Sequence, residues 1–291
     1  MDCFNINGKT RVCGVIGDPI EHTMSPVMHN TAFRQLGLDY IYVPFRVKKE
    51  ALGKTIDGMR ALGIRGLNVT IPHKVSVIPL LDKIDPDAEK IGAVNTIINE
   101  AGTLTGYNTD AAGFLQALRE GGFEPKDKKV IILGAGGAAR AISFVLARNE
   151  TRLTILNRQL ELDWAVTLAQ QLSRISKGEV KALLMDEPNL TAALRDADLV
   201  VNATSVGMSP EDKETPVPAP LLRPGLTVFD AVYHPLQTRL LREAKKAGAK
   251  TISGIEMLVW QGALAFTMWT GQQAPTDLMR EEAIKALEYE K

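Results

Sequence analysis

One segment, VIILGAGGAARA (130–141), constrains the fold of this chain more than any other. It places Gly134, Gly136 and Ala139 as G-x-G-x-x-A after a strand-like apolar run and at the expected start of a helix. In such a turn the first glycine permits a tight bend, and the second lets backbone N–H groups approach a pyrophosphate near the helix N-terminus. The segment therefore predicts a dinucleotide-binding unit. The alternative, a glycine-rich turn without a ligand, is disfavoured by this strand–helix context.

Strand-like and helix-like segments alternate on both sides of this motif. Repeated strand–helix–strand units are typical of a doubly wound parallel sheet with helices on both faces, so the fold class is α/β. The expected strands are RVCGVIG (11–17), YIYVPFRV (40–47), 64–71, KKVIILG (128–134), RLTILNR (152–158), EVKALLM (179–185), DLVVNATS (198–205) and TVFDAVYH (227–234).

The helical segments carry start and stop signals. In SPVMHNTAFRQLG, Ser25 is the expected N-cap, Pro26 takes the first helical position and Gly37 ends the helix. A short helix is expected from about His73, and NTIINEAGTLTG (95–106) predicts a hairpin with a glycine-containing loop. Further helices are expected at 48–62, 109–122, 136–149 and 162–174.

Composition narrows the class of protein. The 291 residues carry 34 basic and 34 acidic side chains, so no basic surface for nucleic acid or an anionic membrane is expected. The two cysteines, Cys3 and Cys13, form neither a disulfide framework nor metal spacing, which favours a reducing cytoplasm. The apolar window MLVWQGALAF (257–266) is too short for a membrane span and predicts a buried helix.

The strand after the glycine motif indicates which dinucleotide is bound. An NAD site usually ends this strand with a carboxylate for the ribose 2′-hydroxyl, whereas this strand ends with Asn157 and Arg158. A guanidinium here can pair with a 2′-phosphate, so NADP is expected. The alternatives are that Arg158 is a solvated loop residue, or that nearby Glu161 weakens the preference.

Polar residues gather at the expected strand ends of the first 110 residues, where ligands bind in open α/β sheets. Each also has a structural interpretation, such as a helix cap or a turn. The four histidines show no metal spacing, and there is no G-x-S-x-G elbow or cysteine–histidine signature for acyl transfer. The candidate substrate residues are Thr23, Ser25, Thr70, Lys74, Asn95 and Asp110.

Several motifs together resemble one known family. They occur in the order found in shikimate dehydrogenases, from about residue 11 to residue 271: GDPIEHTMSPVMHN, GLNVTIPHK, IGAVNTI, GYNTDAAG, GAGGAARA, NATSVGM and GIEMLVWQGALAF. The resemblance implies an N-terminal substrate domain (1–109 plus 254–291), a C-terminal Rossmann-like NADP-binding domain (110–253) and a cleft between them. It also implies reversible reduction of 3-dehydroshikimate to shikimate with NADPH.

The resemblance carries residue roles with it. Lys74 matches the family's catalytic lysine and Asp110 its partner aspartate. The substrate carboxylate would be held by Thr23 and Ser25, and the rest of the substrate by Thr70, Asn95, Tyr233 and Gln261. The cofactor residues implied are Gly134, Ala135, Gly136, Gly137, Ala138, Asn157 and Arg158, with Thr204, Ala231 and Gly254 on the nicotinamide side; no metal is implied.

Two departures from the family pattern keep alternatives open. Gln159 stands where many NADP-dependent members have threonine, and the arginine often found a few residues later is missing from QLELDW (159–164). Both features make this chain more similar to the quinate/shikimate dehydrogenases, which use NAD or either cofactor. A catalytically inactive paralogue that senses a similar ligand is the alternative of another class, and a homodimer is left open. Thr23 replaces the usual serine, and Arg239 replaces a usual proline.

Overall fold

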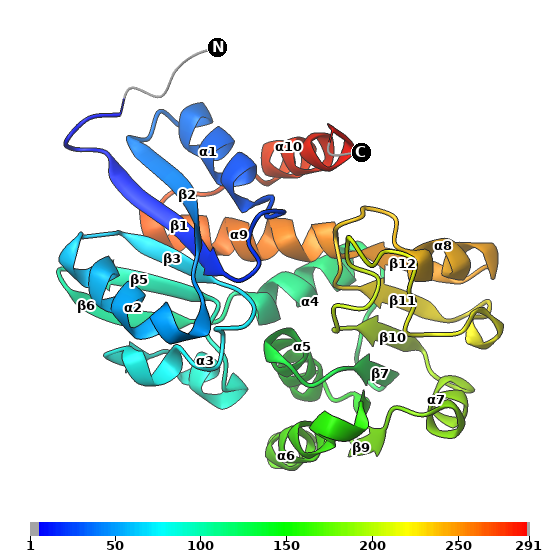
Figure 1. Cartoon of the computed structure of the whole chain (residues 1–291). Coiled ribbons are helices and arrows are strands. Elements are labelled where there is room, and N and C mark those ends of the chain that lie inside the picture. Colours follow the sequence, from blue (N-terminus) through cyan, green and yellow to red (C-terminus); the bar gives the residue numbers. More distant parts are fainter. Residues whose placement is uncertain (1–5, 290–291) are drawn as a thin grey trace. The chain divides into compact units, whose positions relative to one another are not determined.

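The computed structural model describes residues 6–289, so Cys3 lies outside the described residues. The chain divides into two compact units (Figure 1). The first takes in the chain up to Thr109 and returns from Gln261 onward, and the second is Asp110–Trp260. The return therefore occurs inside helix α9 (Gly254–Thr270), seven residues later than the expected start at Gly254.

The first unit is built on a six-stranded sheet in the order β2-β1-β3-β5-β6-β4. This sheet is mixed, because β5 runs antiparallel to both β3 and β6. The confirmed hairpin β5–β6 is the physical reason, since a short loop joins only antiparallel strands. The strands are β1 (Arg11–Gly17), β2 (Tyr40–Arg46), β3 (Gly66–Val69), β4 (Lys83–Ile84), β5 (Thr96–Glu100) and β6 (Thr103–Tyr107).

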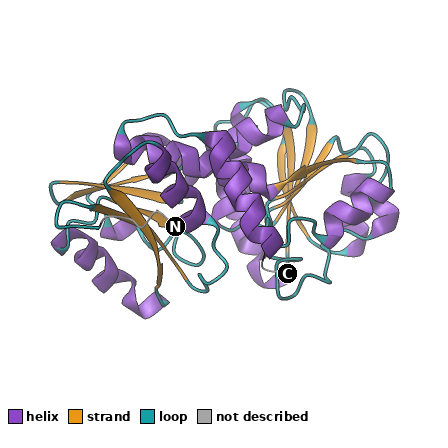
Figure 2. Ribbon diagram, turned by 90° about the horizontal axis from the view of Figure 1, so that it is seen from above, coloured by secondary structure: helices purple, strands orange, loops and turns teal. Residues whose placement is uncertain are grey.

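Helices cover both faces of this sheet (Figure 2). On one face, Leu52, Ile56 and Met59 of α2 pack against buried strand residues such as Leu67 and Ile97. On the other face lie aromatic side chains from α1 and α9. The helices of this unit are α1 (Ser25–Gln35), α2 (Leu52–Ala61), α3 (Pro86–Ile91) and α10 (Thr276–Tyr289), with 3₁₀ turns η1 (Lys49–Ala51) and η2 (Ile78–Leu80).

Two local expectations for the first unit are wrong. Helix α1 begins at Ser25 itself, Met24 takes the cap position, and no side chain caps the helix. Instead the Ser25 N–H points to Thr23 Oγ1 at 3.4 Å. The short helix from His73 does not form: the segment makes isolated turns, ending in η2. The β-branched Val75 and Val77 and the missing N–H of Pro79 disfavour helix propagation there.

A buried histidine lies within the aromatic layer of the first unit. The His29 ring is fully buried, stacks on Tyr42 with ring centroids 4.4 Å apart, and touches Phe33, Phe266 and Trp269. Neither ring nitrogen has a hydrogen-bond partner among the described residues. Burial lowers the pKa of His29 from 6.5 to about 3, so the folded protein holds the ring neutral.

This histidine predicts an acid-sensitive fold. Unfolded His29 takes up a proton below pH 6.5 but folded His29 does not, so its contribution to stability is present above pH 6.5 and is lost as pH falls toward 3. Between pH 7 and pH 4.5 this one residue should cost roughly 2–3 kcal/mol of unfolding free energy. Urea unfolding at both pH values measures it. Between these pH values, the unfolding free energy of His29→Phe should fall by roughly 2–3 kcal/mol less than that of wild type. Equal losses in the two proteins would contradict this role of His29.

The second unit has a six-stranded, fully parallel sheet in the order β12-β11-β10-β7-β8-β9. This is the order of a dinucleotide-binding fold, in which the first and fourth strands of the unit are central neighbours. The parallel doubly wound sheet is thus confirmed here. Its strands are β7 (Lys129–Leu133), β8 (Arg152–Asn157), β9 (Val180–Leu184), β10 (Leu199–Asn202), β11 (Thr227–Asp230) and β12 (Lys250–Ser253).

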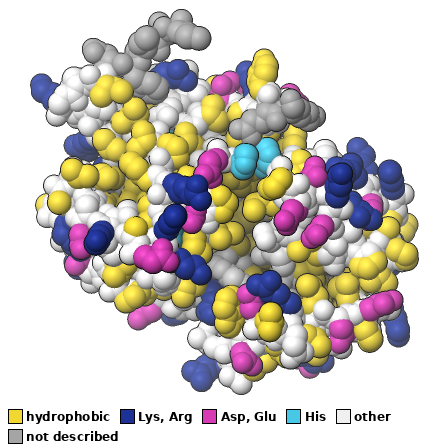
Figure 3. Space-filling view, in the orientation of Figure 1, with side chains coloured by type: hydrophobic (Ala, Val, Ile, Leu, Met, Phe, Trp, Pro, Cys, Tyr) yellow, Lys and Arg dark blue, Asp and Glu magenta, His cyan; other side chains and the backbone are white. Residues whose placement is uncertain are grey.

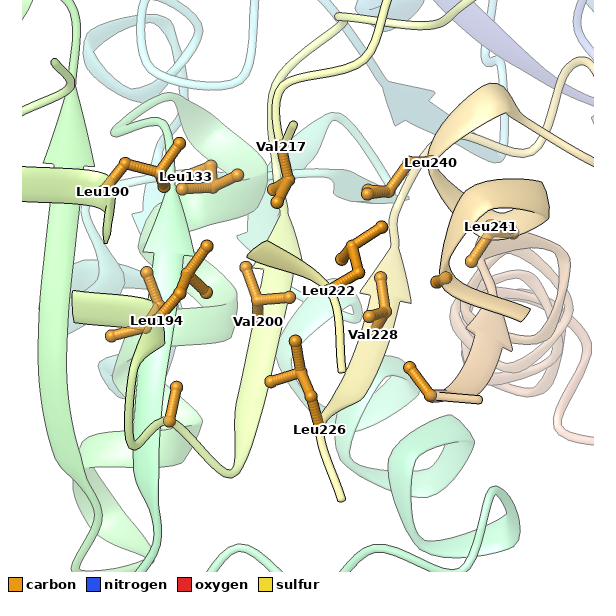
Figure 4. Close-up of a cluster of buried hydrophobic side chains, with 14 of the residues drawn as sticks. Leu133, Leu190, Leu194, Val200, Val217, Leu222, Leu226, Val228, Leu240 and Leu241 are labelled. Atoms are coloured by element: carbon orange, nitrogen blue, oxygen red, sulfur yellow. The ribbon is translucent and has the colours of Figure 1, made fainter. Parts of the chain in front are cut away.

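In the second unit, apolar side chains of the helices pack against both faces of the sheet. On one face, Leu190 and Leu194 of α7 and Leu240 and Leu241 of α8 pack against the sheet, including Val200 (Figure 4). On the other face α4 packs on α5, and Phe114 of α4 meets Phe229 edge-on at 4.8 Å. The helices are α4 (Asp110–Glu120), α5 (Gly137–Arg148), α6 (Leu162–Leu172), α7 (Glu187–Leu194) and α8 (Arg239–Lys246), with η3 (Gln159–Glu161) and η4 (Ala219–Leu221).

The apolar window 257–266 lies within α9, in agreement with the expected helix. Within the described residues no helix is long and apolar enough to cross a membrane. The Cys13 thiol is buried, and burial raises its pKa to about 12, so it stays protonated. On the face shown in Figure 3, basic and acidic side chains are interspersed, as their equal numbers in the sequence suggest.

Candidate active site

In the first unit, the polar residues singled out in the sequence lie at one edge of the sheet. Thr70 and Lys74 follow β3, whereas Asn95 precedes β5. Because β5 runs antiparallel to β3, the N-terminal end of β5 lies beside the C-terminal end of β3. The Val69 N–H donates to Asn95 O at 2.8 Å. The Val94 N–H likewise donates to Lys74 O at 2.7 Å. The structure therefore brings Thr70, Lys74 and Asn95 together.

Asn95 is the centre of a buried hydrogen-bond network. Its amide Nδ2 donates to Thr109 Oγ1 at 2.9 Å and to Gln261 Oε1 at 3.3 Å, and its Oδ1 accepts from the Thr109 N–H at 2.7 Å. Asn95 and Gln261 are nearly fully buried. The network places Gln261, 166 residues further along the chain, beside Asn95. Thr109, which the sequence analysis did not single out, holds the amide in position.

Lys74 leaves the sheet through an anchored turn. The preceding residue, His73, is fully buried, and its Nε2 lies 2.6 Å from Val47 O. The His73 N–H also donates to Thr70 O at 2.9 Å. The Lys74 side chain itself is half-buried. The buried imidazole thus fixes the backbone from which the lysine extends, a role that the sequence analysis did not assign to it.

Thr23 and Ser25 occupy the loop that follows β1 and the start of α1. Ser25 is buried, and Thr23 is partly buried. This loop is tied to the exit of β3, because the Asp18 N–H donates to Ile71 O at 2.9 Å. Gly17 allows the close approach: a Cβ at this position would lie 2.5 Å from Thr70 Cγ2. Both hydroxyls therefore lie on the same edge of the sheet as Thr70.

Asp110 and Tyr233 belong to the second unit. Asp110 is buried and begins α4, one peptide bond after Thr109. Tyr233 is partly buried and lies in the loop between β11 and α8. The positions of these two side chains relative to Lys74 stay a prediction of the sequence.

The glycine motif forms the expected strand–turn–helix. Gly134 has a φ of +100°, a region that side chains disfavour, and its N–H donates to Leu156 O at 2.8 Å. Gly136 is exposed and precedes α5, and a Cβ there would meet nothing within 4 Å. The turn thus presents open backbone N–H groups at a helix N-terminus, which suits a pyrophosphate. Ala135, Gly137 and Ala138 complete it.

A cation lies one turn beyond Gly136. Arg140 is half-buried, and burial lowers its pKa from the usual value. No carboxylate of the described chain pairs with its guanidinium. A partly desolvated cation beside an anion-binding turn adds to the attraction for phosphate. Arg140 was not among the residues expected from the sequence, although its place directly after the G-x-G-x-x-A motif was an available signal.

At the end of β8, Arg158 pairs with a nearby carboxylate. Asn157 is buried and its Nδ2 donates to Glu161 O at 2.7 Å. Arg158 is 66% exposed, and its Nη2 pairs with Glu161 Oε1. Glu161, whose carboxylate could weaken a preference for NADP, is therefore in contact with Arg158, whose guanidinium would support that preference.

The residues expected on the nicotinamide side lie at the ends of β10, β11 and β12. Thr204 follows β10, Ala231 follows β11, and Gly254 follows β12. A Cβ on Gly254 would lie 2.5 Å from Ala231 O, so only glycine fits there. Within residues 6–289 no group of histidine, cysteine or carboxylate side chains could hold a metal ion.

Comparison with known proteins gives the same picture along the chain. Residues 15–97 match a shikimate dehydrogenase substrate binding domain, residues 117–210 match the shikimate / quinate 5-dehydrogenase family, and residues 254–284 match a shikimate 5′-dehydrogenase C-terminal domain. A shikimate dehydrogenase (NADP⁺) from Methanopyrus kandleri is 50% identical, covering 97% of this chain and 98% of the relative. One from Dehalococcoides mccartyi is 49% identical, covering 96% of both.

Solved structures are similar over nearly the whole chain. A shikimate dehydrogenase in complex with NADP⁺ has a TM-score of 0.89 and 45% identity, covering 97% of both chains. The Thermus thermophilus shikimate 5-dehydrogenase with NADP(H) and shikimate has a TM-score of 0.85 and 39% identity, covering 95% of this chain and 99% of the other. A Corynebacterium glutamicum quinate dehydrogenase in complex with NAD has a TM-score of 0.85 but only 31% identity. The match covers 95% of this chain and 99% of the other.

Proposed function

The chain belongs to the shikimate dehydrogenase family, and we propose that it catalyses the reversible reduction of 3-dehydroshikimate to shikimate with NADPH. One observation carries the proposal. The relatives named shikimate dehydrogenase (NADP⁺) match 96–97% of this chain, with identical residues at about half of the matched positions. Both the buried polar edge of the first unit and the glycine turn of the second suit this reaction.

Lys74 is the proposed acid of the reduction. NADPH, when bound, supplies a hydride to the substrate carbonyl carbon, which leaves negative charge on the oxygen. The ammonium of Lys74 stabilises that charge and then donates a proton to the oxygen. Its half-buried position on an anchored turn favours such a role, because a fixed cation needs no reorganisation when the charge appears. Asp110 is the proposed partner that binds a substrate hydroxyl and orients the lysine.

The other polar side chains are proposed to hold the substrate. Thr23 and Ser25 bind its carboxylate at the start of α1, where backbone N–H groups favour an anion. Thr70, Asn95 and Gln261 bind ring hydroxyls, and Tyr233 makes a further contact. The internal hydrogen bonds of Asn95 support this role, because they hold the amide in one orientation before a ligand arrives.

Ser25→Ala tests the carboxylate site. Loss of the hydroxyl should raise KM for shikimate about three- to tenfold with little change in kcat. Because Ser25 does not cap α1, the melting temperature should hold. Steady-state kinetics and thermal unfolding measure both, with Thr31→Ala on the same helix as a control. An unchanged KM with a lower melting temperature would show a structural role only.

The cofactor is proposed to be NADP. The open turn 134–138 and the half-buried Arg140 suit its pyrophosphate, and Arg158 suits its 2′-phosphate. The named relatives support this assignment, since they are NADP⁺ enzymes. Thr204, Ala231 and Gly254 would then contact the nicotinamide end.

A second candidate function is quinate or shikimate oxidation with NAD. The observation that favours it is the pair between Arg158 and Glu161, which competes with a 2′-phosphate for the guanidinium. The quinate dehydrogenase that binds NAD shares the fold at 31% identity, well below the 50% of the NADP⁺ relatives. A ligand-sensing paralogue without activity is opposed by the retention of both Lys74 and Asp110. The homodimer and the cytoplasmic location stay predictions.

The direct test is turnover in the reductive direction. Purified protein is mixed with 3-dehydroshikimate and NADPH, and the loss of NADPH absorbance is followed while the product is identified by chromatography. Shikimate should accumulate in step with NADPH consumption. NADPH consumption without shikimate, or no consumption at all, would refute the proposal.

A further inference from the structure

The last residues of β10 and β11, Asn202 and Asp230, form a buried polar pair in the second unit. They are opposite one another in the sheet, and both are fully buried. Leu133 of β7 pairs with Asn202, and Ser253 of β12 pairs with Asp230, so the four residues form one row across the sheet. This row is the last before the chain enters the loops at the ligand-binding edge.

The carboxylate of Asp230 holds the loop that follows β11 at both ends. Its Oδ1 accepts from the Val232 N–H at 3.1 Å, just beyond the strand. Its Oδ2 accepts from Thr238 Oγ1 at 2.6 Å, where the loop enters α8. Thr238 is the N-cap of that helix and accepts from the Leu241 N–H at 3.3 Å. One carboxylate therefore fixes a loop of eight residues, which includes Ala231 and Tyr233.

The same carboxylate reaches the loop that follows β10 through Asn202. The Asn202 amide Nδ2 donates to Asp230 Oδ1 at 2.9 Å. Its Oδ1 accepts from the Thr204 hydroxyl at 2.6 Å and from the Thr204 N–H at 3.1 Å. The amide also donates to Val206 O at 3.1 Å. Thr204 is thus held by Asn202, which is oriented by Asp230.

The residues just beyond this row are in close contact. A Cβ on Gly134 would lie 3.0 Å from Thr204 Cγ2, and a Cβ on Gly254 would lie 2.7 Å from Asp230 O. The backbones that follow β7, β10, β11 and β12 therefore approach one another above the buried pair. A shift of Asn202 or Asp230 would be transmitted to this whole edge, because close-packed groups cannot yield independently.

Stability alone does not account for a carboxylate at this position. No lysine or arginine of the described chain forms an ion pair with Asp230, and burial raises its pKa to about 6. At neutral pH it is ionised although desolvated, and a well-packed neutral group at such a site is often at least as stable. Buried ionised groups kept near the strand ends where ligands bind are candidates for a functional role.

We propose that Asp230 is a positioning residue for the nicotinamide end of the cofactor. Through Val232 and Thr238 it fixes the loop that carries Ala231, and through Asn202 it fixes the hydroxyl of Thr204. The inference rests on the proposed function, since that function assigns Thr204, Ala231 and Gly254 to the nicotinamide. Asp230 touches neither substrate nor cofactor in this account, and acts only by holding residues that do.

The test compares two ligands that share the adenosine end. NADP carries nicotinamide, whereas adenosine 2′,5′-bisphosphate lacks it. In Asp230→Asn, kcat should fall at least about tenfold, because small misplacement of reacting groups has large effects on rate. The Kd for NADP should rise about three- to tenfold, while the Kd for the bisphosphate stays within twofold and the melting temperature does not fall.

Two further sets of variants keep the test decisive. Thr238→Val should lower kcat, as Asp230→Asn does. Thr238→Ser keeps the hydroxyl, so its kcat should stay close to that of wild type. Asp198→Asn makes the same chemical change at the other end of β10, where Asp198 Oδ2 accepts from the Lys129 N–H, and should leave kcat within twofold of wild type.

The outcomes separate the inference from the proposed function. Asp230→Asn with kcat within twofold of wild type, or with equal weakening of NADP and the bisphosphate, would overturn the positioning role. Wild-type protein that binds NADP but does not act on shikimate would overturn the proposed function alone. The selective loss of NADP over the bisphosphate would still support the role of Asp230.

Discussion

Replacing Lys74 with alanine lowers kcat by about 10²–10⁴, the range expected when a general acid–base group is removed. The charge on the substrate oxygen develops only as the hydride arrives, so the ammonium stabilises the transition state more than the bound substrate. Binding of shikimate should therefore stay measurable, with the loss falling on kcat. Single-turnover rates and shikimate titration measure the two effects separately.

The control for this variant is Lys54→Ala. Lys54 lies exposed on α2, so the same change of residue there should leave kcat unaltered. A Lys74→Ala protein that is folded and retains near wild-type kcat would show that another group supplies the proton. Loss of shikimate binding together with kcat would instead indicate a collapsed site.

The second large effect is expected at Arg158. Arg158→Ala should weaken NADP by about ten- to a hundredfold, because the 2′-phosphate loses charge-assisted hydrogen bonds. NAD has no such phosphate, so its Kd should change little. Added salt should weaken NADP more than NAD in wild type, since the guanidinium is exposed. Titration of both cofactors at two ionic strengths measures these differences.

Replacing Glu161 is expected to have the opposite effect on NADP affinity. Glu161 pairs with the guanidinium of Arg158. Glu161→Gln should release it and tighten NADP severalfold, with NAD again little changed. If Arg158→Ala weakens both cofactors equally, the arginine supports the loop rather than the phosphate, and the NAD-using relatives become the better model.

The glycine motif predicted the second unit well because its physical requirements are local. A strand, a turn with Gly134 at positive φ and a helix that begins after Gly136 can all be recognised within twelve residues. The parallel order of the sheet follows from repeated crossover connections. In contrast, α7, α8 and β12 were not expected, because none of them is longer than eight residues.

The errors in the first unit come from competition between local and tertiary interactions. Serine followed by proline is typical of a helix start, yet Thr23 provides the nearby acceptor and Ser25 lies inside the helix. The turn after β3 looks helical in sequence, yet the buried contact of His73 with Val47 holds it in another conformation. Val47 lies 26 residues from His73 in the sequence, too far for the contact to be recognised from a local pattern.

The candidate site shows the same division. The residues at strand ends could be selected from the sequence because open α/β sheets bind ligands there. Their supporting contacts could not: Thr109 and Gln261 meet Asn95 only in the folded chain, and the pairing of Asn202 with Asp230 depends on strand register. The sequence showed both Arg158 and Glu161, but only the structure shows that they are in contact.

A comparison of two substrates and two cofactors shows whether this chain is an NADP-dependent enzyme acting on shikimate. Initial rates of the purified protein are recorded with shikimate and with quinate, each with NADP and with NAD, and kcat/KM is compared across the four pairs. Shikimate with NADP should give the highest kcat/KM, at least about tenfold above either pair with NAD. A higher kcat/KM for quinate with NAD, or no turnover with any pair, would contradict it.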